Sequence, residues 1–183
     1  MDDDIVFMLG PSGSGKSTLA RWIKEDFDFE HIEVDRWPGG DGIDLEGLRT
    51  VWNCFWTGAD AHPLAAAVNA RVHAAGLRGA TLSFPSGVVF TDEHLAAAER
   101  AGIRSLVLYG TGAECLEAFL RRENKLGRGL NADHWIQNNA RCYAHFSEPR
   151  YAEHRLMVFH DGRFRDRIAL LAEVRGRLTT RCS

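Results

Sequence analysis

An apolar run that ends in a glycine-rich octapeptide constrains the fold of this chain more than any other feature. Residues 5–9 are apolar and are followed at once by GPSGSGKS at positions 10–17. The run has the length and composition of a buried strand, and residues 16–26 favour a helix. The chain must therefore leave a strand, turn tightly and enter a helix. Glycine suits the turn because it adopts positive φ at little cost.

The octapeptide matches G-x-x-x-x-G-K-[ST], the Walker A pattern, with the strand before it and the helix after it that the pattern requires. Gly10, Gly13 and Gly15 allow backbone N–H groups to turn inward around a phosphate, and the helix N-terminus favours an anion. Ser12 and Ser14 complete the part of the loop that is predicted to bind the nucleotide. The sequence thus predicts a site for the phosphates of a nucleoside triphosphate.

The residues that close the octapeptide carry its specific chemistry. Lys16 is expected to reach the β- and γ-phosphates, and the Ser17 hydroxyl is expected to ligate Mg²⁺. Thr18 is a further candidate near the α-phosphate. The alternative interpretation, a tight Gly/Ser turn before an amphipathic helix, would leave the lysine unexplained.

Short apolar runs alternate with longer helical segments along the chain. Strands are expected at residues 5–9, 31–34, 80–84, 105–109 and 155–159, and helices at 16–26, 45–56, 63–75, 92–101 and 113–124. A last helix is expected to pack on the sheet through Ile168, Leu171, Val174 and Leu178. This order predicts an α/β fold, a three-layer sandwich with a five-stranded, mostly parallel sheet in one domain over residues 1–183.

Composition excludes several classes of protein. The 183 residues are 45% apolar and 26% charged, which is typical of a soluble domain. A net charge of −3 without a basic tract argues against a nucleic-acid partner. No apolar stretch is long enough for a membrane span, and the acidic start MDDD is unlike a secretory signal. The four cysteines have no paired spacing. We expect a cytoplasmic protein with reduced thiols, a monomer or homodimer, that acts on a small molecule.

A second informative stretch is HIEVDRW. Asp35 ends an apolar-edged strand and follows Lys16 by 19 residues, and Glu33 lies two residues before it. The carboxyl ends of parallel strands face the ligand crevice of an open sheet. Asp35 is therefore expected to orient an acceptor hydroxyl and take its proton, and Glu33 to hold Mg²⁺ through water. The alternative for Asp35 is a solvated cap of the next turn. Arg36 is expected to contact the acceptor, or else to form a surface salt bridge.

With these residues in place, the chain resembles the shikimate kinase and gluconate kinase group of small P-loop kinases. The resemblance rests on the phosphate loop, on the acidic pair Glu33-Val34-Asp35, and on an arginine-bearing helix that leads into RRENKLGRGLNAD at 121–133. SEPRYAEHRLMVF, at 147–159, is loosely similar to the segment before the last strand of shikimate kinases. The resemblance implies a P-loop nucleoside-kinase type of fold, a substrate-binding insertion at about 36–62 and a lid at about 121–133.

The resemblance also implies the activity, which is transfer of the γ-phosphate of ATP, with Mg²⁺, to a hydroxyl of a small metabolite. Arg122 and Arg128, with Arg121 close behind, are expected to neutralise charge in the transition state, since guanidinium groups stay protonated. The alternative is that these arginines are merely solvated on a helix surface.

Three departures from that group bear on the acceptor. Glu33 stands where the group has an aspartate, and the third strand, ATLSFPSG, has neither a Walker B acid nor a triple glycine. Aromatic residues gather where substrate would bind, so shikimate itself is not the expected acceptor. Trp37 and Trp56 are expected to line the acceptor. Trp52 and Trp56 share a helix face, and core packing is the alternative for that pair.

Two other functions remain open from the sequence. A nucleoside monophosphate kinase would take a phosphate as the acceptor and use Arg36 to bind it. A nucleotide-dependent switch would transfer nothing, and the missing Walker B acid is consistent with it. Cys142, His145 and His134 lack the spacing of a zinc site, so no structural metal is expected.

Overall fold

The structure, a computed structural model, describes residues 4–34, 48–127 and 132–179. Seven strands lie in these ranges: β1 Asp4–Leu9, β2 Phe29–Glu33, β3 Gly79–Ser83, β4 Ile103–Tyr109, β5 Arg155–Met157, β6 Phe159–His160 and β7 Arg163–Phe164. The α-helices are α1 Lys16–Phe27, α2 Arg49–Gly58, α3 His62–Ala74, α4 Asp92–Arg100, α5 Gly112–Lys125, α6 Ala132–Phe146 and α7 Arg167–Thr179, and a 3₁₀ turn spans Pro149–Tyr151.

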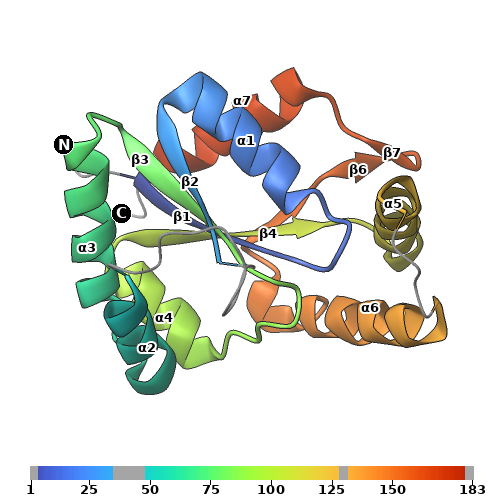
Figure 1. Cartoon of the computed structure of the whole chain (residues 1–183), viewed down its shortest axis with the longest axis horizontal. Helices are drawn as coiled ribbons and strands as arrows, with labels where there is room; N and C mark the ends of the chain where they lie inside the picture. The colour runs from blue at the N-terminus through green and yellow to red at the C-terminus, as the bar shows by residue number, and fades with distance from the viewer. Residues whose placement is uncertain (1–3, 35–47, 128–131, 180–183) are drawn as a thin grey trace.

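Five strands form one parallel sheet in the order β2-β3-β1-β4-β5 (Figure 1). β1 lies at its centre, with Ile5 opposite Ala80 of β3 on one side and Ile103 of β4 on the other. Parallel neighbours need long crossover connections, which the helices supply. The predicted fold class, a three-layer α/β sandwich with a five-stranded sheet, is confirmed.

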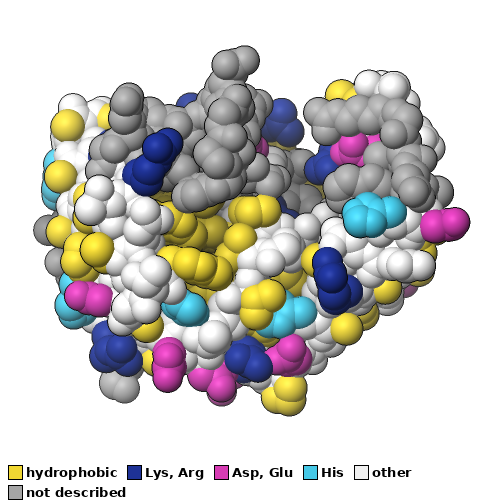
Figure 2. All heavy atoms as spheres, turned by 60° about the horizontal axis from the view of Figure 1, so that its bottom comes forward, with side chains coloured by type: hydrophobic (Ala, Val, Ile, Leu, Met, Phe, Trp, Pro, Cys, Tyr) yellow, Lys and Arg dark blue, Asp and Glu magenta, His cyan; other side chains and the backbone are white. Residues whose placement is uncertain are grey.

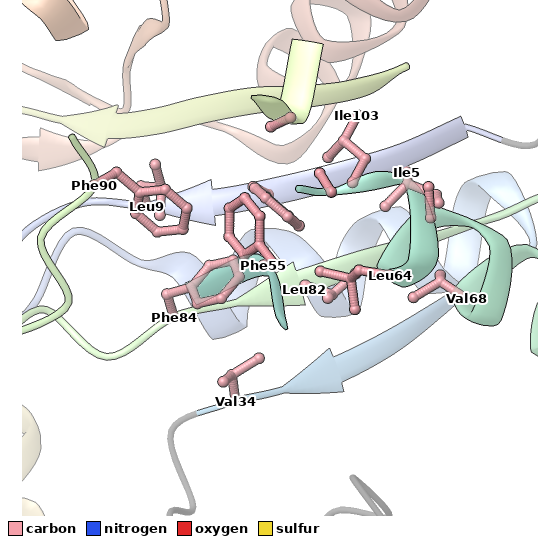
Figure 3. Close-up of a cluster of buried hydrophobic side chains, with 14 of the residues drawn as sticks. Ile5, Leu9, Val34, Phe55, Leu64, Val68, Leu82, Phe84, Phe90 and Ile103 are labelled. Carbon is pink, nitrogen blue, oxygen red and sulfur yellow. The ribbon is translucent and has the colours of Figure 1, made fainter. Parts of the chain in front are cut away.

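The two faces of β1 bury separate cores. Ile5, Phe7 and Leu9 face α2, α3 and α4, where an aromatic cluster surrounds them (Figure 3). The ring of Phe7 lies 5.0 Å from that of Phe84 and 5.6 Å from that of Phe55. Because successive strand residues point to opposite faces, β1 must be apolar from Ile5 to Leu9 to satisfy both cores.

The opposite face of the sheet is covered by α1 and α7 (Figure 1). Val6 and Met8 of β1 pack there with Ile23 of α1 and with Leu170 and Val174 of α7. Burial on both faces explains why the strand that leads into the phosphate loop is apolar at every position from Ile5 to Leu9. It also anchors the loop at a rigid point.

Side-chain caps mark the starts of two helices. At α4, the Thr91 hydroxyl accepts the His94 N–H, and the His94 side chain accepts the Thr91 N–H. Thr111 and Glu114 form the same reciprocal pair at the start of α5. Thr111 and Glu114 also take part in the site described below.

Three expectations about the chain's second half are wrong in detail. The strand expected at 155–159 ends at Met157, and the chain then forms the antiparallel hairpin β6–β7. The loop expected to reach Asp133 ends sooner, because α6 begins at Ala132. Ile168 was expected to face the sheet but is 82% exposed, since it lies in the first turn of α7, ahead of the buried stripe that starts at Leu170.

Among the helices of the described residues, none is both long and apolar enough to cross a membrane.

Candidate functional site

The octapeptide forms a closed loop between β1 and α1. Gly10, Gly13 and Gly15 all have positive φ, at 137°, 81° and 84°. The ammonium nitrogen of Lys16 lies 2.8 Å from the carbonyl oxygen of Gly10 and 3.1 Å from that of Pro11. The lysine thus folds back across the loop, and its charge is held at the loop's centre.

Packing beneath the loop leaves no room for side chains at its glycines. A Cβ on Gly13 would lie 2.0 Å from the carbonyl oxygen of Cys115 in α5, and one on Gly10 would lie 2.4 Å from that of Leu108 in β4. Both obstacles are backbone atoms, which cannot move aside cheaply. Burial raises the pKa of the Cys115 thiol to about 12, so this cysteine is an inert part of the floor.

The start of α1 faces the same space. Gly15, the residue before the helix, is left-handed and offers no side-chain cap. The first N–H groups of a helix have no partner within it, so those of α1 remain available to an anion. The hydroxyl-bearing Ser17 is exposed there, and Thr18 is half-buried. By contrast, the hydroxyl of Ser14 is fully buried, without a hydrogen-bond partner among the described residues, and Ser14 does not line the cavity.

A cavity of about 620 Å³ opens from the loop. Its walls come from the loop and the start of α1, from α5, and from the β6–β7 hairpin. Five lining side chains are cationic and two are acidic: Lys16, Arg21, Arg121, Arg122 and Arg163, against Glu114 and Glu117. The cavity therefore favours a polyanion of about nucleotide size.

The structure brings two of the three predicted arginines to this cavity. Arg121 forms an ion pair with Glu117, one turn earlier on the exposed side of α5. Arg122 pairs with Glu123, whose carboxylate is 2.8 Å from the arginine's Nε, and its guanidinium lies 5.3 Å from the Phe119 ring centre. The expected lid is largely helical at its two ends, as residues 121–125 belong to α5 and residues 132–133 to α6.

The β6–β7 hairpin is part of the site that the sequence reasoning missed. The Phe164 ring lies against Gly15, since a Cβ on that glycine would be 2.4 Å from it, and it packs edge-on to Trp22 of α1. Glu114 holds the hairpin turn by accepting the Gly162 N–H at 3.0 Å. The dipeptide Asp161-Gly162 between two phenylalanine-containing pairs is a recognised hairpin signal that could have revealed it.

Backbone hydrogen bonds keep Glu114 ionised. Its carboxylate accepts the Thr111 N–H at 2.7 Å as well as that of Gly162. These bonds, that of Thr111 first, lower the pKa of Glu114. One side chain thus caps α5 and fastens the hairpin beside the cavity.

Serine hydroxyls occupy the end of the third strand, where the sequence lacks an acid. Ser83 Oγ lies 2.9 Å from the Nε2 of His31 on β2, and burial, ahead of nearby charges, lowers the pKa of His31. Three residues later, Ser86 lines the cavity, and its Oγ is 2.6 Å from that of Ser12 in the phosphate loop. Ser86 is a second site residue that the sequence reasoning missed, because a lone serine after a strand carries no signal of its own.

The end of β2 is described only as far as Val34. Glu33 is the last residue of β2, half-buried and paired in register with Ser83 of β3. Asp35, Arg36, Trp37 and Arg128, which the sequence analysis placed in the site, lie outside the described residues.

The two tryptophans of α2 differ in environment. Trp52 is 6% exposed and belongs to the core, as the packing alternative has it. Trp56 is 37% exposed, and its ring is nearly parallel to those of Trp52 and His94. Trp56 does not line the cavity beside the phosphate loop. Figure 2, with the side of α2, α4 and α6 turned forward, shows hydrophobic side chains gathered in a hollow of this face.

Comparison with solved structures identifies the fold. A gluconokinase from Sinorhizobium meliloti 1021 superposes with a TM-score of 0.52 at 19% identity, over 97% of this chain and 92% of that one. A shikimate kinase from Acinetobacter baumannii, in complex with shikimate, gives 0.54 at 16% identity over 96% and 93%. This chain has the fold of the small P-loop kinases.

A sugar kinase from Janibacter sp. HTCC2649 shares the P-loop kinase fold as well, with a TM-score of 0.52 at 17% identity over 97% of this chain and 96% of that one. No protein-family model matches the sequence. No curated protein matches it either. Across the whole length, therefore, the likeness to these kinases is one of fold at low sequence identity. The activities named above belong to those proteins.

Proposed function

We propose that this protein is a small-molecule kinase that moves the γ-phosphate of ATP, with Mg²⁺, to a hydroxyl of a small metabolite. The observation that carries the proposal is the position of Lys16, bonded to two loop carbonyls at the start of an uncapped helix. Such a loop is built to hold phosphates, and here it opens into a cavity with arginines on a second wall. The named activities of the structural neighbours support the proposal.

Different parts of the cavity would bind the phosphates and the base of a nucleotide. The loop, Lys16 and Thr18 would hold the phosphates through backbone N–H groups and the ammonium. The β6–β7 hairpin contributes the rings of Phe159 and Phe164 to the cavity, and these suit the flat, partly apolar base and ribose. Arg121 and Arg122 lie on the α5 wall, within the same cavity as the loop.

The residues present also fit a magnesium ion. Mg²⁺ prefers oxygen ligands and keeps several waters, with one or two protein groups and substrate phosphates completing its shell. The exposed hydroxyl of Ser17 would hold the ion directly and the Glu33 carboxylate through water. When bound, the ion neutralises charge on the β- and γ-phosphates.

Transfer requires an oxygen nucleophile and a place for its proton. The acceptor oxygen forms a bond to the γ-phosphorus while the bond from that phosphorus to the bridging β-γ oxygen breaks, and ADP leaves. Asp35 would accept the hydroxyl proton, with Arg36, Trp37 and Trp56 as the acceptor's other neighbours. Lys16, Arg121, Arg122 and Arg128 would stabilise the charge that spreads over the transferring group.

A phosphorylation screen tests the proposal. The purified chain would be incubated with ATP and Mg²⁺ and a panel of sugars, sugar acids, polyols, nucleosides and nucleoside monophosphates, with ADP release and ³¹P NMR as readouts. We expect ADP release that depends on one hydroxyl compound, and a phosphate ester as product. Asp35→Asn should then lower turnover far more than ATP affinity.

The same screen separates the two alternatives. A monophosphate kinase would respond to nucleoside monophosphates, and Arg36→Ala would raise their KM. A switch would hydrolyse ATP slowly whatever the acceptor. Either result would overturn the proposed transfer to a hydroxyl.

A further inference from the structure

One residue of the phosphate loop, Ser12, is held by two distant parts of the chain. The side-chain nitrogen Nδ2 of Asn139, on α6, donates to the Ser12 carbonyl oxygen at 3.1 Å. The Ser86 hydroxyl, after β3, lies 2.6 Å from the Ser12 hydroxyl. Both polar groups of Ser12 beyond its N–H are thus engaged outside the loop, 127 and 74 residues away in sequence.

The burial of Asn139 makes its contact with the loop informative. Asn139 is 3% exposed, whereas its helix neighbours Asn138 and Arg141 are hydrogen-bonded to each other at the surface. Burying an amide is costly unless it is hydrogen-bonded, and an apolar residue would pack there more cheaply. An amide at this position therefore has a specific use, and its partner in the structure is the phosphate loop.

Because the peptide bond is planar, the contact between Asn139 and the Ser12 carbonyl also fixes the direction of the Gly13 N–H. In a trans peptide the C=O of one residue and the N–H of the next point in opposite directions. With the Ser12 carbonyl drawn toward Asn139 on α6, the Gly13 N–H points the other way. Asn139 does not line the cavity, whereas Ser12 and Gly13 do. The arrangement therefore presents a donor, and withdraws a carbonyl, on the side where a phosphate would lie.

We propose that Asn139 and Ser86 are positioning residues that lock Ser12 so that the Gly13 N–H faces the phosphate of the bound nucleotide. The inference rests on the proposed function and assigns a new role within the same site. Preorganised donors cost no rearrangement when the anion arrives. A loop free to rotate its 12–13 peptide would instead present the Ser12 carbonyl oxygen to the phosphate part of the time and repel it.

The test compares variants that differ by a few atoms. Asn139→Ala removes the donor, and Asn139→Asp keeps the shape while placing a negative charge against the Ser12 carbonyl. Ser86→Ala removes the second hold, and Ser86→Thr restores the hydroxyl. Asn138→Ala is the matched control, because Asn138 is the next residue of α6 and bonds to Arg141 of the same helix at 2.8 Å.

Mg-ADP affinity by calorimetry is the first readout. We expect a Kd about 10-fold weaker in Asn139→Ala, the equivalent of one hydrogen bond, and weaker still in Asn139→Asp. Ser86→Ala should weaken binding several-fold and Ser86→Thr should restore it, with Asn138→Ala unchanged. Folded variants of Asn139 and Ser86 that bind like the wild type would overturn the inference.

The Gly13 amide signal gives a second readout that does not depend on any variant folding. In a ¹⁵N-labelled wild-type protein, Mg-ADP should move the Gly13 amide proton strongly downfield, as a direct bond to phosphate does. If Lys16 and Ser17 amides shift while that of Gly13 stays still, the positioning role is wrong although nucleotide binding stands. If the wild type binds no nucleotide, the proposed function fails and this inference fails with it.

Discussion

The ammonium of Lys16 lies 2.8 Å from the carbonyl oxygen of Gly10, the residue at which the buried strand β1 gives way to the loop. The contact closes the loop on itself and points the lysine's charge inward. An incoming phosphate would therefore meet a cation already in place, beside the first N–H groups of α1.

Replacement of Lys16 should abolish phosphoryl transfer and spare the fold. Lys16→Met keeps most of the side-chain volume but removes the charge, and we expect turnover to fall by about 10²-fold or more, as when one preorganised donor is lost at other active sites. The melting temperature should change little, because the core residues of β1 and α1 are untouched. Turnover within threefold of the wild type would contradict this role.

Alanine variants of the two arginines on the α5 wall should differ in how much stability they lose. Arg122 pairs with Glu123, which is 4% exposed, so Arg122→Ala should cost about 1–3 kcal/mol of unfolding free energy as well as turnover. Arg121 pairs with Glu117 on the exposed surface, so Arg121→Ala should cost less than about 1 kcal/mol. Urea unfolding beside steady-state kinetics checks both. Equal stability losses would contradict the assignment.

Glycine substitutions should distinguish crowding from backbone strain. Gly13→Ala places a Cβ 2.0 Å from a backbone carbonyl at a φ of 81°, and we expect a loss of about 2–5 kcal/mol of unfolding free energy. Gly102→Ala has a similar φ of 76° but no atom within 4 Å, so it should cost only about 1–2 kcal/mol. Chemical unfolding of the two variants measures the difference. Similar losses would show that strain alone matters at Gly13.

The acid sensitivity of the site should depend on Glu114. Its pKa is lowered in the folded protein, so its contribution to stability is present above the ordinary glutamate pKa of about 4.3 and is lost as pH falls through the folded pKa. Glu114→Gln should therefore flatten the fall in melting temperature between about pH 5 and pH 3. Glu99→Gln, on α4, is the charge-matched control. An unchanged pH profile in Glu114→Gln would contradict the anchoring role.

The sequence predicted the parts of this fold whose signal is local. The apolar composition of Ile5, Phe7 and Leu9 predicts a strand, and the glycines after them predict a turn. The position of Arg122 near the loop was also predicted, through the resemblance to the small P-loop kinases. Ile168 shows the limit: spacing marks a helix face, but only the sheet's extent decides where the buried stripe begins.

Other parts of the site depend on contacts that sequence patterns do not carry. Asn139 is hydrogen-bonded to Ser12, 127 residues away in sequence, and no sequence pattern near either residue predicts this contact. The contact of Ser86 with Ser12 likewise depends on the pairing of β3 with β1, which the sequence around Ser86 does not indicate. The β6–β7 hairpin is an intermediate case. Its Asp161-Gly162 turn could have been predicted from the sequence, but the contact of Phe164 with Gly15 could not.

Calorimetric titration with Mg²⁺ and a series of adenosine, ADP and ATP tests the central claim most directly. If the loop around Lys16 holds the phosphates, one site should bind ADP and ATP far more tightly than adenosine, and Lys16→Met should remove that advantage. Adenosine binding as tightly as ADP, ADP binding that survives Lys16→Met, or no binding of ADP or ATP at all would contradict the account.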